Sequence, residues 1–351
     1  MAGPMRLLFV KLKHIGDALL LSATLDAVRL AHPKAEIWVV VRRGTEGILR
    51  GCRAIDHLLT AAPPEAKNRG PAQWWNEVKL LLELRRQRFD YAFELTDGDR
   101  GRVLVGLSGA ANRCVNTSFY KLNPWWRTWF NRTSDREWTS GHRVEKDFHA
   151  VNDFLAIGSA PPPMRFDAAL THPWAPVAGQ SHYAVLHPGT RWKRKQWPMD
   201  RWVEVGRWLM GKGLRVVVSA GPDAEEVAGA AELVNALGGD AISTAGQLSW
   251  AHLAGLLQRA RLFVGVDTAA MHLAAACQCP TVAIFGPSSV SQWQPWRVDA
   301  RVVQPRGIRW DGKSGGEELM GLIESADVIG AGCELLNAVG ARPRLDHGAP
   351  A

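Results

Sequence analysis

The sequence alternates short apolar runs with longer amphipathic stretches, and this alternation limits the possible folds more than any other feature. The apolar run at 6–12 is followed by a stretch with apolar residues at helical spacing over 17–30. The same order of strand, turn and helix begins again at 183–186 and continues to a last apolar run at 281–285. Strands that alternate with helices predict an α/β fold with helices on both faces of a parallel sheet. Because no short repeat period is visible, we expect two similar α/β domains and no solenoid.

Prolines indicate where the two domains meet. A chain of 351 residues is long enough to bury one core in each of two domains. The segment 158–180 holds three consecutive prolines and two more after them, which is typical of a linker. We therefore expect an N-terminal domain over 1–165, a Pro-rich linker over 166–180, a C-terminal domain over 181–340 and a disordered tail over 341–351.

The charge and the apolar runs limit the classes of partner. A formal net charge of +8 implies an anionic partner, which could be a nucleotide, a nucleic acid or an anionic membrane surface. The longest apolar runs fall far short of the roughly 20 residues that a membrane span needs. The first ten residues lack the long apolar region and the cleavage site of a signal peptide. We expect a cytoplasmic protein.

The five cysteines are scattered along the chain. Cys277 and Cys279 form the one close pair, in an apolar segment with no second Cys or His pair at zinc spacing. The cysteines are therefore expected to be buried free thiols.

The segment 112–142 interrupts the alternation. It is rich in Trp, Arg, Asn and Ser, and it contains Trp125, Trp126 and Trp129 beside basic residues. Long irregular connections in compact domains are often functional, so we predict a functional loop or an irregular subdomain here. Indoles near cations suit sugar stacking or a membrane interface, although packing is the more common role of tryptophan.

The turn at 187–198 is a candidate phosphate site. It follows an expected strand and contains Thr190 and four basic residues between positions 191 and 195. Backbone N–H groups at a strand-to-helix turn attract anions, Thr190 can donate from its hydroxyl, and Lys195 or Arg191 can neutralise a diphosphate. A solvated basic loop is the alternative. The Walker pattern GxxxxGK[ST] is absent.

A second candidate turn follows the expected strand at 262–266. Asp267 or Thr268 would cap the next helix, and His272 lies one turn further on. The alternative is an ordinary Asp cap with a satisfied histidine. If instead the helix N-terminus points at the same diphosphate, its partial positive charge contributes about 0.3 to 1 kcal/mol.

Two further turns carry acidic residues. In the turn at 221–226, which contains Glu225, a carboxylate could reach a ribose hydroxyl, although helix-capping acids are an equally good explanation. At the first strand-to-helix turn, Asp17 follows Gly16 and could be the general base that takes a proton from an acceptor hydroxyl. An N-cap is the alternative for Asp17, and a helix N-terminus would lower its pKa and weaken it as a base.

Three motifs together resemble glycosyltransferase family 9, the ADP-heptose:lipopolysaccharide heptosyltransferases. They are the segments 11–17, 187–198 and 267–276, and the resemblance extends from residue 6 to about 285, more loosely to 338. The form Lys-x-Lys-His-x-Gly-Asp at 11–17, with the segment 142–146, is most similar to the branch that adds the third, side-branch heptose to the inner core.

The resemblance implies a GT-B fold, in which two Rossmann-like domains with parallel sheets face each other across a cleft. The N-terminal domain would bind the acceptor and the C-terminal domain the nucleotide sugar. The reaction would be an inverting, metal-independent transfer of heptose from ADP-heptose to the lipopolysaccharide inner core, with no cofactor. The implied site residues are Asp17 as base, Thr190 and Lys195 at the diphosphate, Thr268, Ala269, Ala270 and His272 at the phosphate end of the donor, Asp267 elsewhere on the donor, and Glu225 at the ribose.

The sequence departs from the family pattern at two places. Ala269 stands where the family usually has Gly, and 306–316 replaces a Cys-rich stretch found in many members. The alternatives are therefore a family 9 enzyme with another nucleotide sugar, a non-catalytic scaffold of the same fold, and a nucleic-acid-binding protein. No nucleic-acid-binding motif supports the last of these. If the acceptor is lipid-anchored, Trp125, Trp126 and Trp129 would contact it at the anionic inner membrane face.

Overall fold

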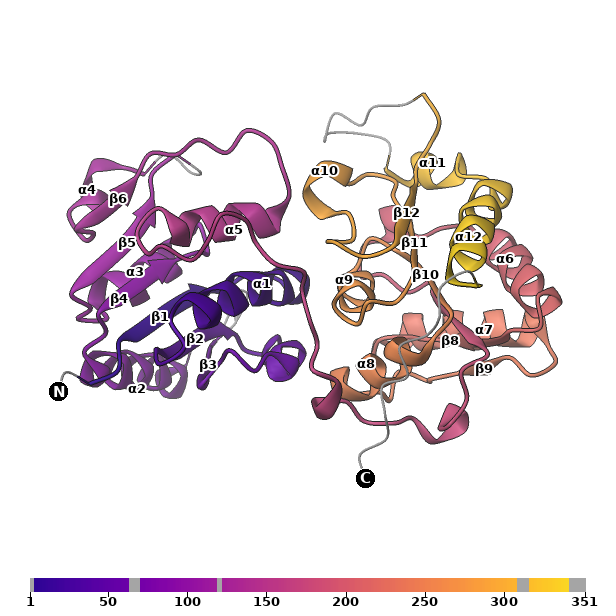
Figure 1. Ribbon diagram of the computed structural model, residues 1–351, viewed down its shortest axis with the longest axis horizontal. Coiled ribbons are helices and arrows are strands. Elements are labelled where there is room, and N and C mark those ends of the chain that lie inside the picture. The colour runs from indigo at the N-terminus through magenta and orange to yellow at the C-terminus, as the bar shows by residue number, and fades with distance from the viewer. Residues whose placement is uncertain (1–2, 63–69, 119–121, 308–315, 341–351) are drawn as a thin grey trace. The chain divides into compact units, whose positions relative to one another are not determined.

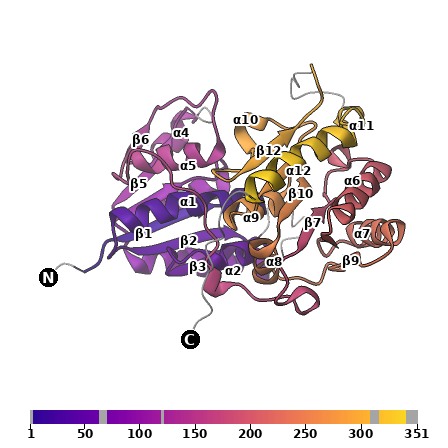
Figure 2. The same cartoon turned by 45° about the vertical axis from the view of Figure 1, so that its right-hand side comes forward.

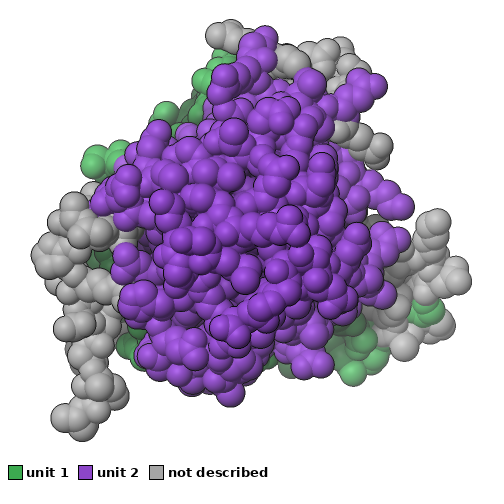
Figure 3. Space-filling view, turned by 90° about the vertical axis from the view of Figure 1, so that its right-hand side faces the viewer, with its two compact units in different colours: residues 1–171 green, residues 172–351 purple. Residues whose placement is uncertain are grey.

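The computed structural model describes residues 3–62, 70–118, 122–307 and 316–340. The chain divides into two compact units, 1–171 and 172–351, which are coloured separately in Figure 3. The division between Thr171 and His172 falls inside the segment expected to be a linker. The expected tail at 341–351 lies outside the described residues.

The first unit is built on a parallel sheet of six strands in the order β3-β2-β1-β4-β5-β6 (Figure 1). The central strands are continuous apolar runs because both of their faces are covered. The outer strand β6 is short, and its residues are mostly exposed. The strands are β1 (Arg6–Lys11), β2 (Glu36–Arg42), β3 (His57–Ala61), β4 (Tyr91–Glu94), β5 (Asn112–Asn116) and β6 (Arg132–Ser134).

Helices lie on both faces of this sheet. One face packs against α2, α3 and α4, whose apolar residues join the same buried cluster as Leu8 and Val10 of β1. The helix α1 packs against both α5 and η1. The helices are α1 (Ile15–Ala31), η1 (Glu46–Gly51), α2 (Pro71–Gln87), α3 (Asp99–Leu107), α4 (Pro124–Arg127), α5 (Arg143–Asn152) and η2 (Ala168–Leu170).

The second unit repeats the same plan. Its parallel sheet has the order β12-β11-β10-β7-β8-β9, so the connections reverse direction between β7 and β10 (Figure 2). The first unit reverses in the same way between β1 and β4. The strands are β7 (Tyr183–His187), β8 (Arg215–Val218), β9 (Ile242–Ser243), β10 (Leu262–Val266), β11 (Thr281–Ile284) and β12 (Ala300–Val303).

Two layers of helices enclose this second sheet. The helices α6, α7 and α12 share a buried cluster with alternate residues of β7, β8, β10 and β11, and Figure 1 shows α8 and α9 on the opposite side. The helices are η3 (Ala175–Val177), η4 (Lys193–Lys195), α6 (Met199–Gly211), α7 (Ala224–Leu237), α8 (Trp250–Arg259), α9 (Ala269–Ala276), α10 (Val290–Trp293), α11 (Gly316–Gly321) and α12 (Ser325–Gly340).

One expectation about secondary structure is wrong. The segment 112–142 is not a long loop, because it continues the alternation with β5, α4 and β6. Trp126 is buried and Trp129 is partly buried, both against the cluster that includes Leu104 and Phe130. The indoles of this segment therefore serve mainly as core residues of the first unit, and Trp125 alone of the three is largely exposed.

All five cysteines are free thiols, and four of them are buried, which confirms the prediction for those four. Cys333 on α12 is partly exposed.

Candidate functional site

The candidate donor site lies at the carboxyl edge of the second sheet, where the connections change direction. The loop 188–198 follows β7, and residues 267–268 follow the neighbouring strand β10. In open α/β sheets, ligands bind outside the carboxyl ends of the strands at such a switch point. The two segments predicted from sequence as phosphate-binding turns are therefore adjacent in space.

An ion pair joins these two segments. Lys195 Nζ lies 2.6 Å from Asp267 Oδ2 and 3.3 Å from the carbonyl oxygen of Asp267. Both side chains are largely shielded from solvent. Asp267 therefore orients the ammonium group of Lys195. The alternative, that Asp267 caps the helix, is wrong, because the N-cap of α9 is Thr268.

The N-terminus of α9 presents polar groups that the described part of the protein does not satisfy. Thr268 occupies the N-cap position, but its side chain makes no capping hydrogen bond. Its Oγ1 is buried and has no hydrogen-bond partner among the described residues. Ala269 and Ala270 form the first turn of α9, where backbone N–H groups lack intrahelical acceptors. A buried donor without a partner carries a free-energy cost that an anionic ligand would remove.

His272 lies one turn further along α9 and is buried. The centroid of its ring is 6.4 Å from that of the Trp293 ring. Lys195, Asp267 and His272 therefore lie near the N-terminus of α9, and their role at a diphosphate stays a prediction.

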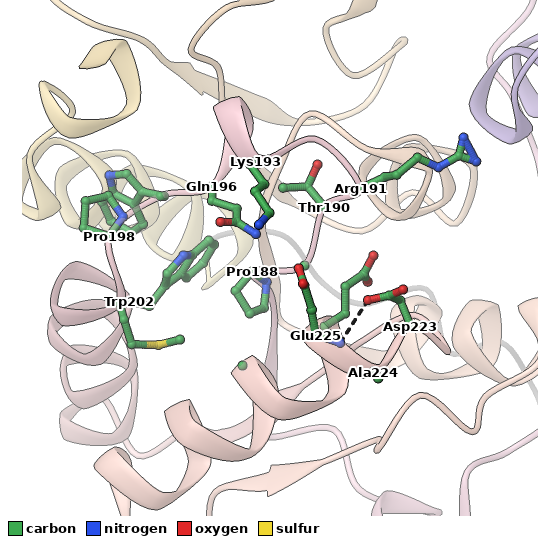
Figure 4. A pocket seen from close by; sticks show the side chains of 15 residues that line it. Pro188, Thr190, Arg191, Lys193, Gln196, Pro198, Trp202, Asp223, Ala224 and Glu225 are labelled. Atoms are coloured by element: carbon green, nitrogen blue, oxygen red, sulfur yellow. Dashed lines mark hydrogen bonds between the residues drawn. The ribbon is translucent and has the colours of Figure 1, made fainter. Parts of the chain in front are cut away.

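A pocket of about 790 Å³ opens between the loop 188–198 and the start of α7. Figure 4 shows Lys193 and Gln196 extending from the loop, with Asp223 and Glu225 across from them on α7. Its volume lies within the range of about 300 to 1,000 Å³ found for small-molecule sites. The mixture of one apolar wall, which includes Trp202, and several polar groups suits a nucleoside.

The acidic residues at the start of α7 have three different roles. Asp223 is the N-cap and accepts a 2.9 Å hydrogen bond from the backbone N–H of Glu225. Glu226 turns back and accepts a 2.9 Å hydrogen bond from the N–H of Gly221. A Cβ on Gly189 would meet the Glu226 carboxylate at 2.5 Å, so a larger residue there would require this side chain to shift. The side chain of Glu225 is exposed at the pocket, and Asp223 is the N-cap in its place.

The basic and hydroxyl residues of the loop 188–198 also make different contacts. Thr190 is buried and its Oγ1 accepts a 3.2 Å hydrogen bond from the N–H of Trp192, which leaves the hydroxyl hydrogen available to donate. Arg194 stacks over the Trp192 ring at 5.2 Å. At the end of β7, burial lowers the pKa of His187 to about 4, so this ring is neutral at pH 7. Positive charge at the switch point therefore comes from Lys195 and not from His187.

In the first unit, Asp17 lies near the carboxyl edge of its own sheet. It is the third residue of α1 and is only 7% exposed. His14 occupies the N-cap position, so the explanation of Asp17 as an N-cap is wrong. No hydrogen bond joins the Asp17 carboxylate to another described residue, which leaves it able to accept a proton from a ligand.

Two buried ion pairs, which the sequence did not predict, lie near this edge. Lys11 Nζ at the end of β1 lies 2.7 and 2.8 Å from the two carboxylate oxygens of Asp147 on α5. Lys146 Nζ lies 2.6 Å from Oδ2 of Asp97, which follows β4 in a left-handed conformation with φ of 56°. Burial lowers the pKa of Lys11, but the carboxylates of Asp147, Asp17 and Asp97 outweigh it and raise the pKa overall. The ammonium group therefore stays charged and holds α5 against the strand that precedes Asp17.

The sequence model of glycosyltransferase family 9 (heptosyltransferase) matches residues 78–313, which is more than half of the chain. The chain belongs to glycosyltransferase family 9. The predicted family is thus confirmed, and neither a nucleic-acid-binding protein nor a non-catalytic scaffold is needed to explain the sequence.

Similar glycosyltransferases support this assignment. The chain is 27% identical over 340 residues to lipopolysaccharide heptosyltransferase 3 of Escherichia coli, covering 92% of this chain and 96% of that protein. It is 25% identical over 295 residues to lipopolysaccharide heptosyltransferase 1 of Escherichia coli strain K12, covering 81% of this chain and 88% of the relative.

Solved structures show that the fold of this glycosyltransferase is the predicted GT-B fold. A family 9 glycosyl transferase from Veillonella parvula has a TM-score of 0.81 at 19% identity, covering 96% of this chain and 99% of that chain. An Escherichia coli heptosyltransferase with ADP has a TM-score of 0.78 at 20% identity, covering 94% and 100%. Among the described residues of this glycosyltransferase, no helix is both long and apolar enough to span a bilayer.

Proposed function

We propose that this glycosyltransferase transfers heptose from ADP-heptose to the inner core of lipopolysaccharide, with inversion at the anomeric carbon and without a metal ion. The observation that carries the proposal is the group formed by Lys195, Asp267 and the unsatisfied hydroxyl of Thr268 at one helix N-terminus. The names of its relatives as lipopolysaccharide heptosyltransferases, and ADP in a similar structure, support the choice of substrates.

The donor diphosphate would bind at the N-terminus of α9. Lys195 and Thr190 would donate to its oxygens, together with the hydroxyl of Thr268 and the N–H groups of Ala269 and Ala270. Asp267 would keep Lys195 in place, and His272 would complete the phosphate end of the site. The nucleoside would extend into the pocket beside α7, where Glu225 can accept hydrogen bonds from the ribose.

The reaction is a single displacement. The acceptor oxygen attacks the anomeric carbon, the bond from that carbon to the diphosphate oxygen breaks, and Asp17 takes the proton of the acceptor hydroxyl. Negative charge grows on the departing diphosphate in the transition state. Lys195 and the N-terminus of α9 stabilise that charge, which is the role that a metal ion would otherwise have.

Another nucleotide sugar is the second candidate for the donor. The residues at the switch point would contact the phosphates of the donor more than its sugar, and the methyl group of Ala269 lies where the family usually has glycine.

The acceptor is anchored to lipid in this proposal. The enzyme would therefore work in the cytoplasm, in peripheral contact with the anionic inner membrane and without nucleic acid.

The Asp17→Asn variant tests the catalytic part of the proposal. Loss of a general base costs about 10²- to 10⁴-fold in rate, so ADP release from ADP-heptose in the presence of a heptose-bearing core acceptor should fall by that factor. ADP affinity should stay within twofold, because Asp17 and the donor residues belong to different units. Transfer at near wild-type rate, or a product with retained anomeric configuration, would refute the mechanism.

A further inference from the structure

An exposed apolar stripe on α2 has no part in the reaction proposed above. Trp74, Trp75, Val78 and Leu82 are 59%, 58%, 40% and 46% exposed. With 3.6 residues per turn, these four side chains fall within an arc of about 100° on the helix. Large apolar side chains that gather on one exposed face usually mark an interaction surface.

The stripe is separate from the side of α2 that packs in the core. Leu80 and Leu84 are buried in the first unit's cluster, and they project from a different side of the helix. The helix therefore has two apolar faces, of which one is already covered by the protein. The second face is available to a partner.

The start of α2 is fixed to its surroundings. Glu77 forms a 3.0 Å ion pair with Arg100 of α3, and its other carboxylate oxygen accepts a 2.9 Å hydrogen bond from the N–H of Ala62. The tryptophans at the first turns of α2 are thus held on a rigid support.

The charges beside the stripe favour an anionic surface. Lys79, Arg85 and Arg86 are all exposed, and on a helical projection each lies within the arc of the stripe or within about 40° of its edge. Glu83 is exposed too, but it lies further round the helix. Basic side chains beside Trp and Leu are typical of helices that lie in the interface of an anionic membrane, where Trp is enriched.

The position of the stripe in the sheet adds a second argument. In a parallel α/β unit, the helix that follows a strand begins at the carboxyl edge of the sheet. Trp74 and Trp75 lie in the first turns of α2 after β3, and Asp17 lies in the first turn of α1 after β1. The exposed indoles and the candidate base therefore share one edge of the first unit.

We propose that the first unit docks on anionic lipid bilayers through α2, with Trp74 and Trp75 in the headgroup region and Lys79, Arg85 and Arg86 against acidic headgroups. The choice of a membrane over another partner rests on the proposed function, since a lipid-anchored acceptor brings the enzyme to a bilayer. The proposal replaces the sequence-based hypothesis that Trp125, Trp126 and Trp129 make this contact, because Trp126 is buried and Trp129 partly buried.

Co-sedimentation of the full chain with vesicles tests the docking surface. The vesicles contain phosphatidylcholine either alone or mixed with phosphatidylglycerol. Wild-type protein should prefer the anionic vesicles, and its binding should fall with salt. The double variant Trp74→Ser/Trp75→Ser and the triple variant Lys79→Gln/Arg85→Gln/Arg86→Gln should each bind at least about tenfold more weakly. The first loses apolar area that is buried in the interface, and the second loses the attraction of its cations to acidic headgroups.

Two variants serve as matched controls. Leu30→Ser removes an apolar side chain that is 76% exposed on α1, and Trp125→Ser removes the exposed indole of α4. Both should bind anionic vesicles like the wild type.

Leu82→Ser is a milder change in the stripe and should weaken binding severalfold without affecting the melting temperature.

The outcomes separate the docking surface from the proposed function. Unchanged vesicle binding in both stripe variants, equal binding to neutral vesicles, or loss of binding in Trp125→Ser would overturn the proposal. The stripe variants should bind ADP like the wild type. Stripe-dependent vesicle binding by a protein that binds no ADP would contradict the donor assignment and leave the docking surface standing.

Discussion

At the residue scale, the hydroxyl of Thr268 is the most informative group in the donor site. It is buried, it occupies an N-cap position, and it has no hydrogen-bond partner in the described part of the chain. The folded protein gains no hydrogen bond from this hydroxyl. We therefore expect the hydroxyl to donate to a bound ligand.

The Thr268→Val variant tests this. Valine keeps the shape of threonine and removes the hydroxyl, so ADP affinity should fall about 10- to 150-fold, the equivalent of one lost hydrogen bond to a charged acceptor. The melting temperature should stay the same or rise, since an unpaired buried polar group is removed. Thr268→Ser is the control and should retain most of the affinity. A less stable variant with unchanged ADP affinity would show that the hydroxyl has a structural role instead.

Glu94 gives a prediction about pH. It is buried, and its carboxylate accepts backbone hydrogen bonds from Thr96 and Asp97 at 2.8 and 3.2 Å. Burial, followed by the charge of Asp97, raises its pKa from 4.5 to about 7. The folded protein therefore keeps this proton when the unfolded chain has lost it, and the stability that results is lost as the pH rises through 7.

Glu94→Gln removes this titration. The difference in melting temperature, variant minus wild type, should increase between about pH 5 and pH 8, and the corresponding free-energy change is at most on the order of 3 kcal/mol. Differential scanning fluorimetry across this range measures it. A difference that stays constant with pH, or that decreases, would contradict the raised pKa.

The sequence indicated candidate donor residues but not the contacts between them. A basic turn after one apolar run and an Asp-Thr pair after another are local signals, so Lys195, Asp267 and Thr268 could be found. Their ion pair could not, because 72 residues separate Lys195 from Asp267. Lys11 gave no signal of a role, since its partner Asp147 is 136 residues away.

At the scale of elements, α5 is held in place by charge as well as by apolar packing. Its first turns carry Lys146 and Asp147, which pair with the ends of the strands on either side of the switch point in the first sheet. Removing one partner of a buried ion pair destabilises a protein, whereas replacing both partners with apolar residues often leaves the stability unchanged.

Lys11→Met should therefore destabilise the protein by about 3 to 5 kcal/mol, because it leaves the Asp147 carboxylate buried and unpaired. The double variant Lys11→Met/Asp147→Leu should recover most of that loss. Chemical or thermal unfolding of both variants measures the difference. If the double variant is no more stable than the single one, the cost does not come from an unpaired charge.

The strands that the sequence missed have short or interrupted apolar patterns. The first two residues of β5 are only partly buried, and β6 is exposed at two of its three positions. Outer strands of this kind lack the apolar run that identified β1 and β10. The sequence therefore predicted the centre of each sheet and missed the outer strands β5 and β6 of the first sheet and β12 of the second.

At the scale of the whole molecule, the two units share one strand order and each has its own buried cluster. In both units the candidate residues lie at the carboxyl edge of the sheet beside the switch point. Asp17 belongs to the first unit, and Lys195, Asp267 and Thr268 belong to the second. We therefore assign the base to one unit and the nucleotide to the other.

Titration calorimetry of ADP, UDP and GDP into the purified chain in EDTA tests this assignment of the nucleotide site. Lys195→Ala is the key variant, and Lys212→Ala, which removes an exposed lysine at the end of α6, is its matched control. We predict metal-free binding with preference for ADP, lost in Lys195→Ala and kept in Lys212→Ala. Preference for UDP or GDP would assign another sugar donor, and failure of all three nucleotides to bind would contradict the site at the switch point.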